Sequence, residues 1–73
     1  MSQRLTPIKR REFIKRLRRL GWEGPFPGGS HHYMKKQAHT IPIPSYAEID
    51  SGKLREMLQE FNISREEWLS AAR

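Results

Sequence analysis

The sequence predicts an α+β fold in which helices pack on one face of a small antiparallel sheet. Two amphipathic helical patterns lie toward the two ends of the chain. Between them, short strand-like segments are separated only by glycines, prolines and tight turns. Strands that follow one another without an intervening helix pair antiparallel. The expected order is therefore helix, three strands, helix, in two layers, with a short extra helix at the C-terminus.

The first helix is expected over about residues 9–20. The apolar residues that follow the helical repeat and would face the core are Phe13, Ile14, Leu17 and Leu20. On another face of the helix, a cationic stripe consists of Arg11, Lys15 and Arg18. Like charges at this spacing repel one another, and a polyanionic partner would relieve that repulsion. Gly21 is expected to end the helix in a left-handed conformation.

A short first strand is expected around residues 21–23. A stiff connection through Gly24-Pro25-Phe26-Pro27 would then lead to Gly28 and Gly29, because these residues break regular structure. The second strand is expected over residues 30–36.

The third strand is expected over residues 39–43, after a tight turn at Gln37-Ala38. It should lie at an edge of the sheet, because the prolines in Ile41-Pro42-Ile43-Pro44 cannot donate to neighbouring strands on both sides. Residues 45–50 are expected to be a linker.

The C-terminal part predicts two helices. The first covers about residues 51–61, and its apolar positions are Leu54, Met57, Leu58 and Phe61. After a turn at Asn62-Ile63, Ser64 and Glu67 form a capping box that opens the last helix, and Ile63 and Trp68 form a hydrophobic staple. The α-β-β-β-α order is also that of double-stranded-RNA-binding domains, and the short C-terminal helix is an addition to it. Topology alone assigns no activity.

Length and composition limit the possible functions. A chain of 73 residues supports one domain, spanning residues 1–73. Such a domain buries only about 60 % of its unfolded surface, so a shallow surface site is expected. The lack of cysteine excludes disulfides and thiolate metal sites. No apolar run approaches membrane-spanning length, and the N-terminal Met1-Ser2-Gln3-Arg4 lacks the apolar core of a signal peptide, so we expect a cytoplasmic protein without membrane contact.

Positive charge is concentrated in the first half of the chain. Residues 1–36 contain ten of the 14 Lys and Arg and two of the eight Asp and Glu, a net charge of +8. Residues 37–73 contain the other four and six, a net charge of −2, which gives the total of +6. This asymmetry favours a polyanionic partner, and nucleic acid before a membrane.

The segment with the most chemical potential is Gly28-Gly29-Ser30-His31-His32-Tyr33, followed by Lys35-Lys36. A histidine that follows a glycine turn and precedes a cationic strand is placed to meet a phosphate and to move a proton. An imidazole, with an ordinary pKa of about 6.5, can act as base or acid near neutral pH. His31 is therefore the candidate catalytic residue. Weaker candidates for a second proton-transfer group are Tyr33, His32 and Lys35.

Substrate contacts are expected from residues that can approach or neutralise a phosphate. They are Gly29, Ser30, Lys35, Lys36, Arg11, Lys15 and Arg18. Glycine lets the backbone come close to RNA, and cations stabilise developing charge. Because neighbours in a strand face opposite ways, we expect His31 to be exposed and His32 to be half-buried.

No metal ion or small-molecule cofactor is expected. A metal site would need His31, His39 and a carboxylate to converge, and their spacing matches no known ligand signature. Aromatic side chains could stack on bases, but packing in the core or in a lid over it explains them better. These residues are Trp22, Phe26, Phe61 and Trp68.

The chain resembles the HicA (YcfA-like) family, small bacterial and archaeal toxins of toxin–antitoxin pairs. Four motifs carry the resemblance over about residues 7–69, in the family's order: the basic helix ending Leu20-Gly21-Trp22, then Gly29-Ser30-His31, Ile41-Pro42-Ile43-Pro44, and Leu54-Arg55-Glu56-Met57-Leu58 with Asn62-Ile63-Ser64. The resemblance implies a metal-independent mRNA endoribonuclease with a fold similar to RNA-binding domains. It also implies that His31 is catalytic and that a HicB antitoxin is the partner.

The sequence departs from the family pattern after the third strand. Many members carry a histidine shortly after the proline there, and this chain has Ser45-Tyr46. The connection Gly24-Pro25-Phe26-Pro27 also replaces a more polar stretch of many relatives. Both departures bear on substrate choice and on any residue that assists His31.

Two other functions would also use parts of this sequence. A non-catalytic RNA-binding module would use the same basic residues and give His31 no chemistry, and it stays open as the alternative. A DNA-binding helix-turn-helix would use the last two helices. We reject it because its recognition helix would begin Ser64-Arg65-Glu66-Glu67, and phosphates would repel the paired carboxylates.

Overall fold

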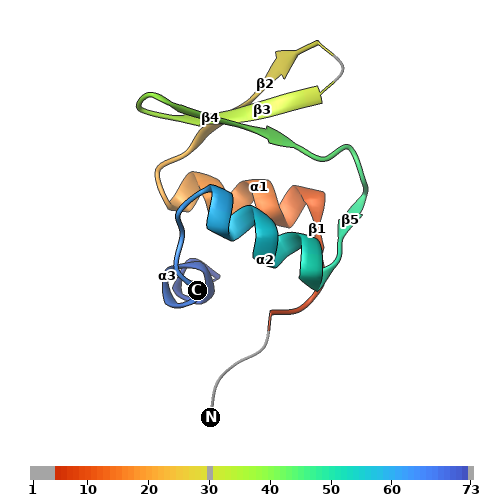
Figure 1. Cartoon of the computed structure of the whole chain (residues 1–73), viewed down its shortest axis with the longest axis vertical. Coiled ribbons are helices and arrows are strands. Elements are labelled where there is room, and N and C mark those ends of the chain that lie inside the picture. The colour runs from red at the N-terminus through yellow and green to blue at the C-terminus, as the bar shows by residue number, and fades with distance from the viewer. Residues whose placement is uncertain (1–4, 30, 73) are drawn as a thin grey trace.

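Three helices lie on one side of a three-stranded antiparallel sheet (Figure 1). The computed structural model describes residues 5–29 and 31–72. Its elements are β1 (Ile8–Lys9), α1 (Arg10–Arg19), β2 (Glu23–Gly28), β3 (His31–Lys36), β4 (His39–Ile43), β5 (Glu48–Ile49), α2 (Ser51–Glu60) and α3 (Arg65–Ser70). This arrangement confirms the predicted α+β class, the α-β-β-β-α order and the extra C-terminal helix. No helix in the described ranges is long and apolar enough to cross a membrane.

Helix α1 matches the predicted first helix. Its apolar face is buried, and the cationic stripe Arg11, Lys15 and Arg18 is exposed. Gly21 has a φ of +95°, and its N–H donates to the carbonyl of Arg18 over 3.1 Å. The N–H of Trp22 donates to the carbonyl of Leu17 over 2.9 Å. These two bonds are those of a Schellman motif, which confirms the predicted left-handed end of the helix.

Strand β2 corrects the prediction for the segment before the glycine turn. A short strand at 21–23 and a stiff connection were expected, but the strand covers Glu23–Gly28 and includes both prolines. It lies at the edge of the sheet, where missing N–H groups are tolerated. A register irregularity between Glu23 and Phe26 accommodates Gly24-Pro25, and Gly24 adopts a φ of +127°. The glycines and prolines thus shape the strand and do not end it.

Strands β3 and β4 lie where the sequence predicts them. Ser30, the first residue of the predicted second strand, lies outside the described residues. The tight turn between the two strands places Gln37 at a φ of +55°. Strand β4 is an edge strand, as its prolines predicted, and it pairs with β3 in a register that sets Met34 opposite Ile41.

The predicted linker at residues 45–50 contains strand β5, which is a second correction. It pairs antiparallel with β1, with Ile8 opposite Ile49. Both isoleucines are buried, at 7 % and 0 % exposure. Two-residue strands carry no periodic pattern, so only the tertiary structure reveals this pair. It holds the beginning of α1 beside the segment that leads into α2.

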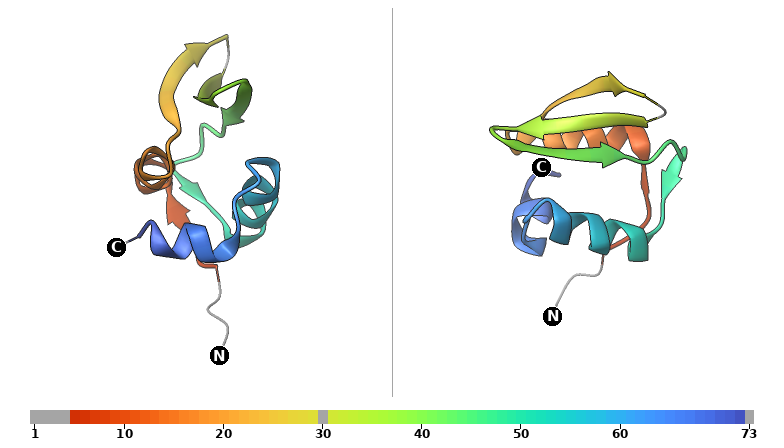
Figure 2. Two further views of the ribbon diagram at one scale, coloured as in Figure 1. Left: turned by 90° about the vertical axis from the view of Figure 1, so that its left-hand side faces the viewer. Right: turned by 45° about the horizontal axis from the view of Figure 1, so that its top comes forward.

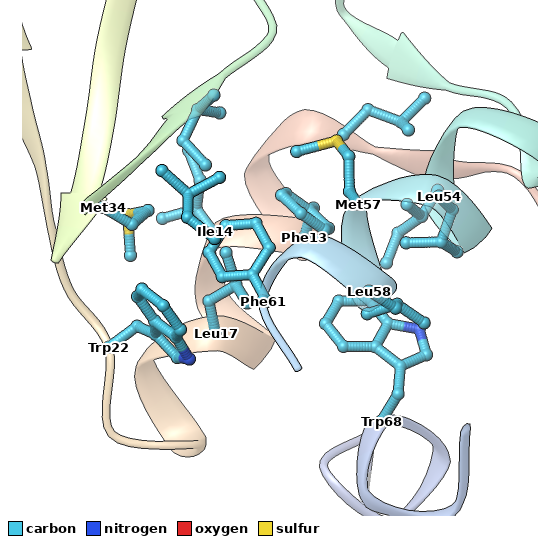
Figure 3. Packing of buried hydrophobic residues seen from close by; sticks show 14 residues of the cluster. Phe13, Ile14, Leu17, Trp22, Met34, Leu54, Met57, Leu58, Phe61 and Trp68 are labelled. Atoms are coloured by element: carbon cyan, nitrogen blue, oxygen red, sulfur yellow. The ribbon is translucent and has the colours of Figure 1, made fainter. Parts of the chain in front are cut away.

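The hydrophobic core lies between the sheet and the helices (Figure 3). The ring centroids of Trp22 and Phe61 are 4.4 Å apart, and Phe13 lies 6.1 Å from Phe61 and 5.4 Å from Trp68. Trp22, Phe61 and Trp68 are each at most 4 % exposed. They are therefore core residues, as expected. Phe26 lies outside this core cluster.

The C-terminal helices begin and end as the sequence predicts. Asn62 has a φ of +58° after α2, and the N–H of Ile63 donates to the carbonyl of Leu58 over 2.9 Å. The capping box of α3 is complete: the N–H of Ser64 donates to Oε1 of Glu67, and the N–H of Glu67 donates to Oγ of Ser64, both over 3.1 Å. These hydrogen bonds, the one from the Ser64 backbone first, lower the pKa of the Glu67 carboxyl.

Candidate functional site

His31 lies beside a surface pocket at the edge of β4. The pocket has a volume of about 360 Å³ and is bounded by β4, the segment after it and α2. Residues that line it include His31, Pro44, Ser45, Tyr46, Lys53 and Glu60. His31 is exposed, as predicted from the alternation of β3. A surface pocket is therefore present beside the predicted histidine, and it is the candidate site.

Four side chains of this pocket can transfer protons or carry charge. They are the imidazole of His31, the phenol of Tyr46, the ammonium of Lys53 and the carboxylate of Glu60. Tyr46 is 61 % exposed, so its hydroxyl is accessible to a substrate. Sequence reasoning selected only His31, because the other three come from segments far along the chain. Tyr46 alone had a signal, since it follows the edge strand where the family resemblance expects a histidine.

His32 is exposed, which corrects the half-buried position expected for it. It shares a strand face with Met34, which is fully buried, but His32 lies at the end of the sheet beside Arg10. Nη2 of Arg10 is 3.1 Å from Nδ1 of His32. A guanidinium can only donate, so Nδ1 accepts this hydrogen bond and Nε2 carries the ring proton.

Arg10 connects this part of the sheet to the loop that carries Tyr46. Its Nε donates to the carbonyl of Pro44 over 2.9 Å, and its backbone N–H donates to the carbonyl of Ala47, also over 2.9 Å. The residues bonded to Arg10 thus flank Ser45 and Tyr46 in sequence. Arg10 therefore positions one wall of the pocket. Sequence reasoning did not select it, because it is one of several arginines in a basic helix.

The predicted binding cations do not form one continuous surface. Lys35 and Lys36 are neighbours in β3, so they face opposite sides of the sheet. Nζ of Lys36 donates to the carbonyl of Leu20 over 3.0 Å, at the end of α1. Nε of Arg18 donates to the carbonyl of Gly24 over 2.8 Å. Lys36 and Arg18 therefore also fasten the sheet to α1.

The glycine turn is open to solvent. Gly29 has a φ of +63°, which side chains rarely adopt, and no atom lies within 4 Å of the position where its Cβ would be. A polyanion can therefore approach its backbone. Ser30, the other predicted contact in this turn, lies outside the described residues.

His31 and His39 lie at opposite ends of the β3–β4 hairpin. His39 pairs with Lys36 at one end, whereas His31 is at the other end, one residue beyond the pair of His32 and Ile43. The two imidazoles are therefore too far apart along the hairpin to converge on one ion. Among the described residues, no three His, Asp or Glu side chains are arranged to hold a metal ion.

Comparison with known proteins gives one match. Residues 10–63 match the family model described as HicA toxin of bacterial toxin–antitoxin. The matched range begins with α1, includes β3 and β4, and ends just after α2, so it contains the whole pocket beside His31. No curated protein and no solved structure matches the chain.

Proposed function

Because the chain belongs to the HicA family, toxins of toxin–antitoxin systems, we propose that it is an mRNA endoribonuclease with His31 as its general acid–base group. The family is known for toxins that cleave mRNA. The observation that carries the proposal is that an exposed imidazole shares a pocket with a phenol and an ammonium group. This set supplies the proton acceptor, the proton donor and the positive charge that RNA cleavage needs.

The proposed reaction is an internal displacement at phosphorus. His31 accepts the proton of a ribose 2′-hydroxyl as its oxygen forms a bond to the adjacent phosphorus. The bond from phosphorus to the 5′-oxygen breaks, and that oxygen takes up a proton from an acid in the pocket. The products are a 2′,3′-cyclic phosphate and a free 5′-hydroxyl, so no metal-bound water is required.

Tyr46 is the proposed second proton-transfer group. Its phenol lines the same pocket as His31 and is exposed, whereas the earlier candidates lie elsewhere: Tyr33 and Lys35 line no part of that pocket, and His32 is held by Arg10. Lys53 can stabilise the charge that develops on the phosphate. The expected rate is modest, because the site is open to water and such electrostatic effects are weakened there.

The proposed RNA contacts extend from the pocket to the sheet and α1. Lys35, Lys36 and the stripe Arg11, Lys15 and Arg18 supply positive charge, and Gly29 supplies backbone that RNA can approach. Ser30 is proposed as a further contact from its place in the sequence. Lys36 retains two further N–H donors beside its bond to Leu20. The substrate is mRNA, so the proposed place of action is the cytoplasm.

The proposed inhibitor is a HicB-like antitoxin that covers His31. A shallow pocket with an exposed histidine has no lid of its own within the described residues, so inhibition requires a partner. The net charge of +6 favours an acidic partner, whose approach would be accelerated by opposite charge and slowed by salt.

The alternative is a non-catalytic RNA-binding module. It would use the same cations and leave His31 without a chemical role. The deciding experiment is cleavage of a labelled RNA by purified wild-type protein and by a His31→Ala variant, with RNA binding measured for both. Loss of cleavage with retained binding supports the enzyme, whereas wild-type cleavage by the variant would exclude the assignment of His31.

A further inference from the structure

The sheet face opposite the helices carries a pair of aromatic rings. Phe26 of β2 and Tyr33 of β3 are register partners, and their ring centroids are 5.4 Å apart with planes inclined by 35°. Met34, the neighbour of Tyr33, is fully buried on the helix side. Alternation along β3 therefore places Tyr33, and with it Phe26, on the outer side of the sheet.

These two rings do not belong to the core. All three helices lie on the other side of the sheet, and no described element covers the outer side (Figures 1 and 2). Neither ring is part of the buried cluster, and both remain partly exposed. A cross-strand aromatic pair outside the core stabilises the pairing of β2 with β3, and its partly exposed rings also offer a surface on which a base can stack.

Gly28 shapes the surface beside Tyr33. A Cβ at Gly28 would lie 2.7 Å from Cδ1 and 2.9 Å from Cε1 of Tyr33, so only a bare backbone leaves room for the ring. The ring of Tyr33 therefore lies close against the backbone of β2 at Gly28. With Phe26 beside it, it forms a low aromatic surface that a flat ligand can reach.

The groups around the rings are those that recognise a nucleotide. Lys35 is two residues from Tyr33 along β3, so alternation places it on the same side of the sheet. His31 is two residues from Tyr33 in the other direction, at the end of the strand, where it borders the pocket formed with α2. Lys35 is exposed and can contact a phosphate, while His31 also lines the candidate catalytic pocket. The aromatic surface thus lies between a phosphate-binding cation and the proposed catalytic residue.

We infer that Phe26 and Tyr33 form a platform on which one unpaired base of the RNA substrate stacks, next to the phosphate that is cleaved at His31. This inference rests on the proposed function and adds the class of ligand that the outer sheet face binds. The base must be unpaired, because bases in an A-form duplex are stacked on one another and do not expose their faces. Ring stacking accepts every base, so we expect little sequence preference at this position.

The test uses short single-stranded oligonucleotides with 2′-O-methyl riboses. They lack the 2′-hydroxyl nucleophile, so binding is measured without cleavage whichever residue is catalytic. Tyr33→Leu and Phe26→Leu should each weaken binding about 5- to 100-fold, the effect of losing one stacked base. Tyr33→Phe, the matched control, keeps the ring and should bind within about twofold of the wild type.

Two further measurements separate stacking from damage to the fold. A series of oligonucleotides, each with one abasic position, removes the bases one at a time. When the missing base is the one that stacks on Tyr33, wild type and Tyr33→Leu should bind equally well. Tyr33→Trp should retain binding, and the fluorescence of the introduced tryptophan should be quenched by RNA. The two native tryptophans are buried in the core and respond little.

The outcomes distinguish this inference from the proposed function. The platform would be overturned if both leucine variants bound RNA with wild-type affinity. It would also be overturned if Tyr33→Leu bound more weakly than the wild type wherever the abasic position was placed. Either result would leave the nuclease proposal standing. Ring-dependent binding by a protein that cleaves no RNA would support the platform and exclude the nuclease. A wild-type protein that binds no oligonucleotide would overturn both.

Discussion

Nη2 of Arg10 lies 3.1 Å from Nδ1 of His32, whereas His31, the next residue back along the chain, faces the pocket of Tyr46 and Lys53. Two adjacent histidines therefore have different surroundings. One ring is held by a charged donor that also binds the carbonyl of Pro44. The other is exposed beside the groups that can act on RNA. Substitutions at these two positions should separate chemistry from structural support.

Replacement of His31 by alanine should abolish RNA cleavage and toxicity with no change in the unfolding transition. His31 is exposed, so its loss creates no cavity, but it removes the proposed proton-transfer group. His32→Ala, the control, should retain cleavage and lose up to about 1 kcal/mol of stability, because it leaves one donor of Arg10 without its partner in an exposed position. Gel assays of cleavage and urea unfolding curves measure the two effects, and equal cleavage by both variants would contradict the assignment.

Replacement of Tyr46 by phenylalanine should reduce cleavage by roughly 10²-fold or more, since general acid–base groups contribute about that factor. RNA affinity should stay near the wild-type value, because the ring remains in place. Lys53→Gln should instead weaken both binding and cleavage, because it removes positive charge from the same pocket. Single-turnover kinetics with separately measured RNA affinity provide the comparison. If Tyr46→Phe cleaved RNA at the wild-type rate, a group other than Tyr46 would have to donate the proton to the leaving 5′-oxygen.

The salt dependence of RNA binding should show whether both lysines of β3 contact phosphates, and stability should distinguish the two lysines. Each phosphate contact contributes about 0.7–0.9 to the slope of log affinity against log salt. Lys35→Gln and Lys36→Gln should each reduce the slope by about this amount, and the double variant by roughly twice as much. Only Lys36→Gln should also lower stability, because its ammonium binds the carbonyl of Leu20. An unchanged slope in the double variant would place the RNA on another surface.

A HicB-like antitoxin should protect the backbone amides of β3 and of the segment around Tyr46 from hydrogen exchange. These segments border the pocket at His31, which the partner must cover to exclude RNA. Association should slow as salt rises, because it depends on opposite charge. If only α3 were protected and the complex still bound RNA, inhibition would have to act from a distance.

Stability should decrease in acid partly through the capping box of α3. The Ser64 hydrogen bonds lower the pKa of the Glu67 carboxyl in the folded state. The stability that ionised Glu67 gives to the fold is therefore complete above its unfolded pKa, and it is lost as the pH falls through its folded pKa. Glu67→Gln should reduce this part of the acid dependence. Ser64→Ala should cost roughly 1 kcal/mol at neutral pH, as the loss of an N-cap commonly does. Urea unfolding at several pH values tests both, and an identical acid dependence of the Glu67→Gln variant and the wild type would contradict the first expectation.

Much of the fold follows from patterns within single segments. The apolar repeat of α1 and α2, the left-handed Gly21 and the Ser64–Glu67 box are local features, and each lies where the sequence predicts it. The segment at β2 was misjudged for a physical reason. Glycine and proline usually end strands, but an edge strand with a register irregularity can include them.

The candidate site was only partly predictable. His31 has a local signal in the glycine turn, whereas Tyr46, Lys53 and Glu60 reach the pocket only because α2 packs beside the edge of β4. Arg10 and the pair β1–β5 hold that edge in place, and neither has a sequence pattern that distinguishes it. Residues brought together by tertiary contacts can be identified only after the elements are placed.

The prolines of β2 and β4 have a consequence for assembly. Both outer strands of the sheet contain them, so each exposed edge lacks N–H groups at Pro25 and Pro27 on one side and at Pro42 on the other. A foreign strand needs a continuous row of donors and acceptors to extend a sheet. Copies of the protein are thereby hindered from joining edge to edge into fibrils through these two strands.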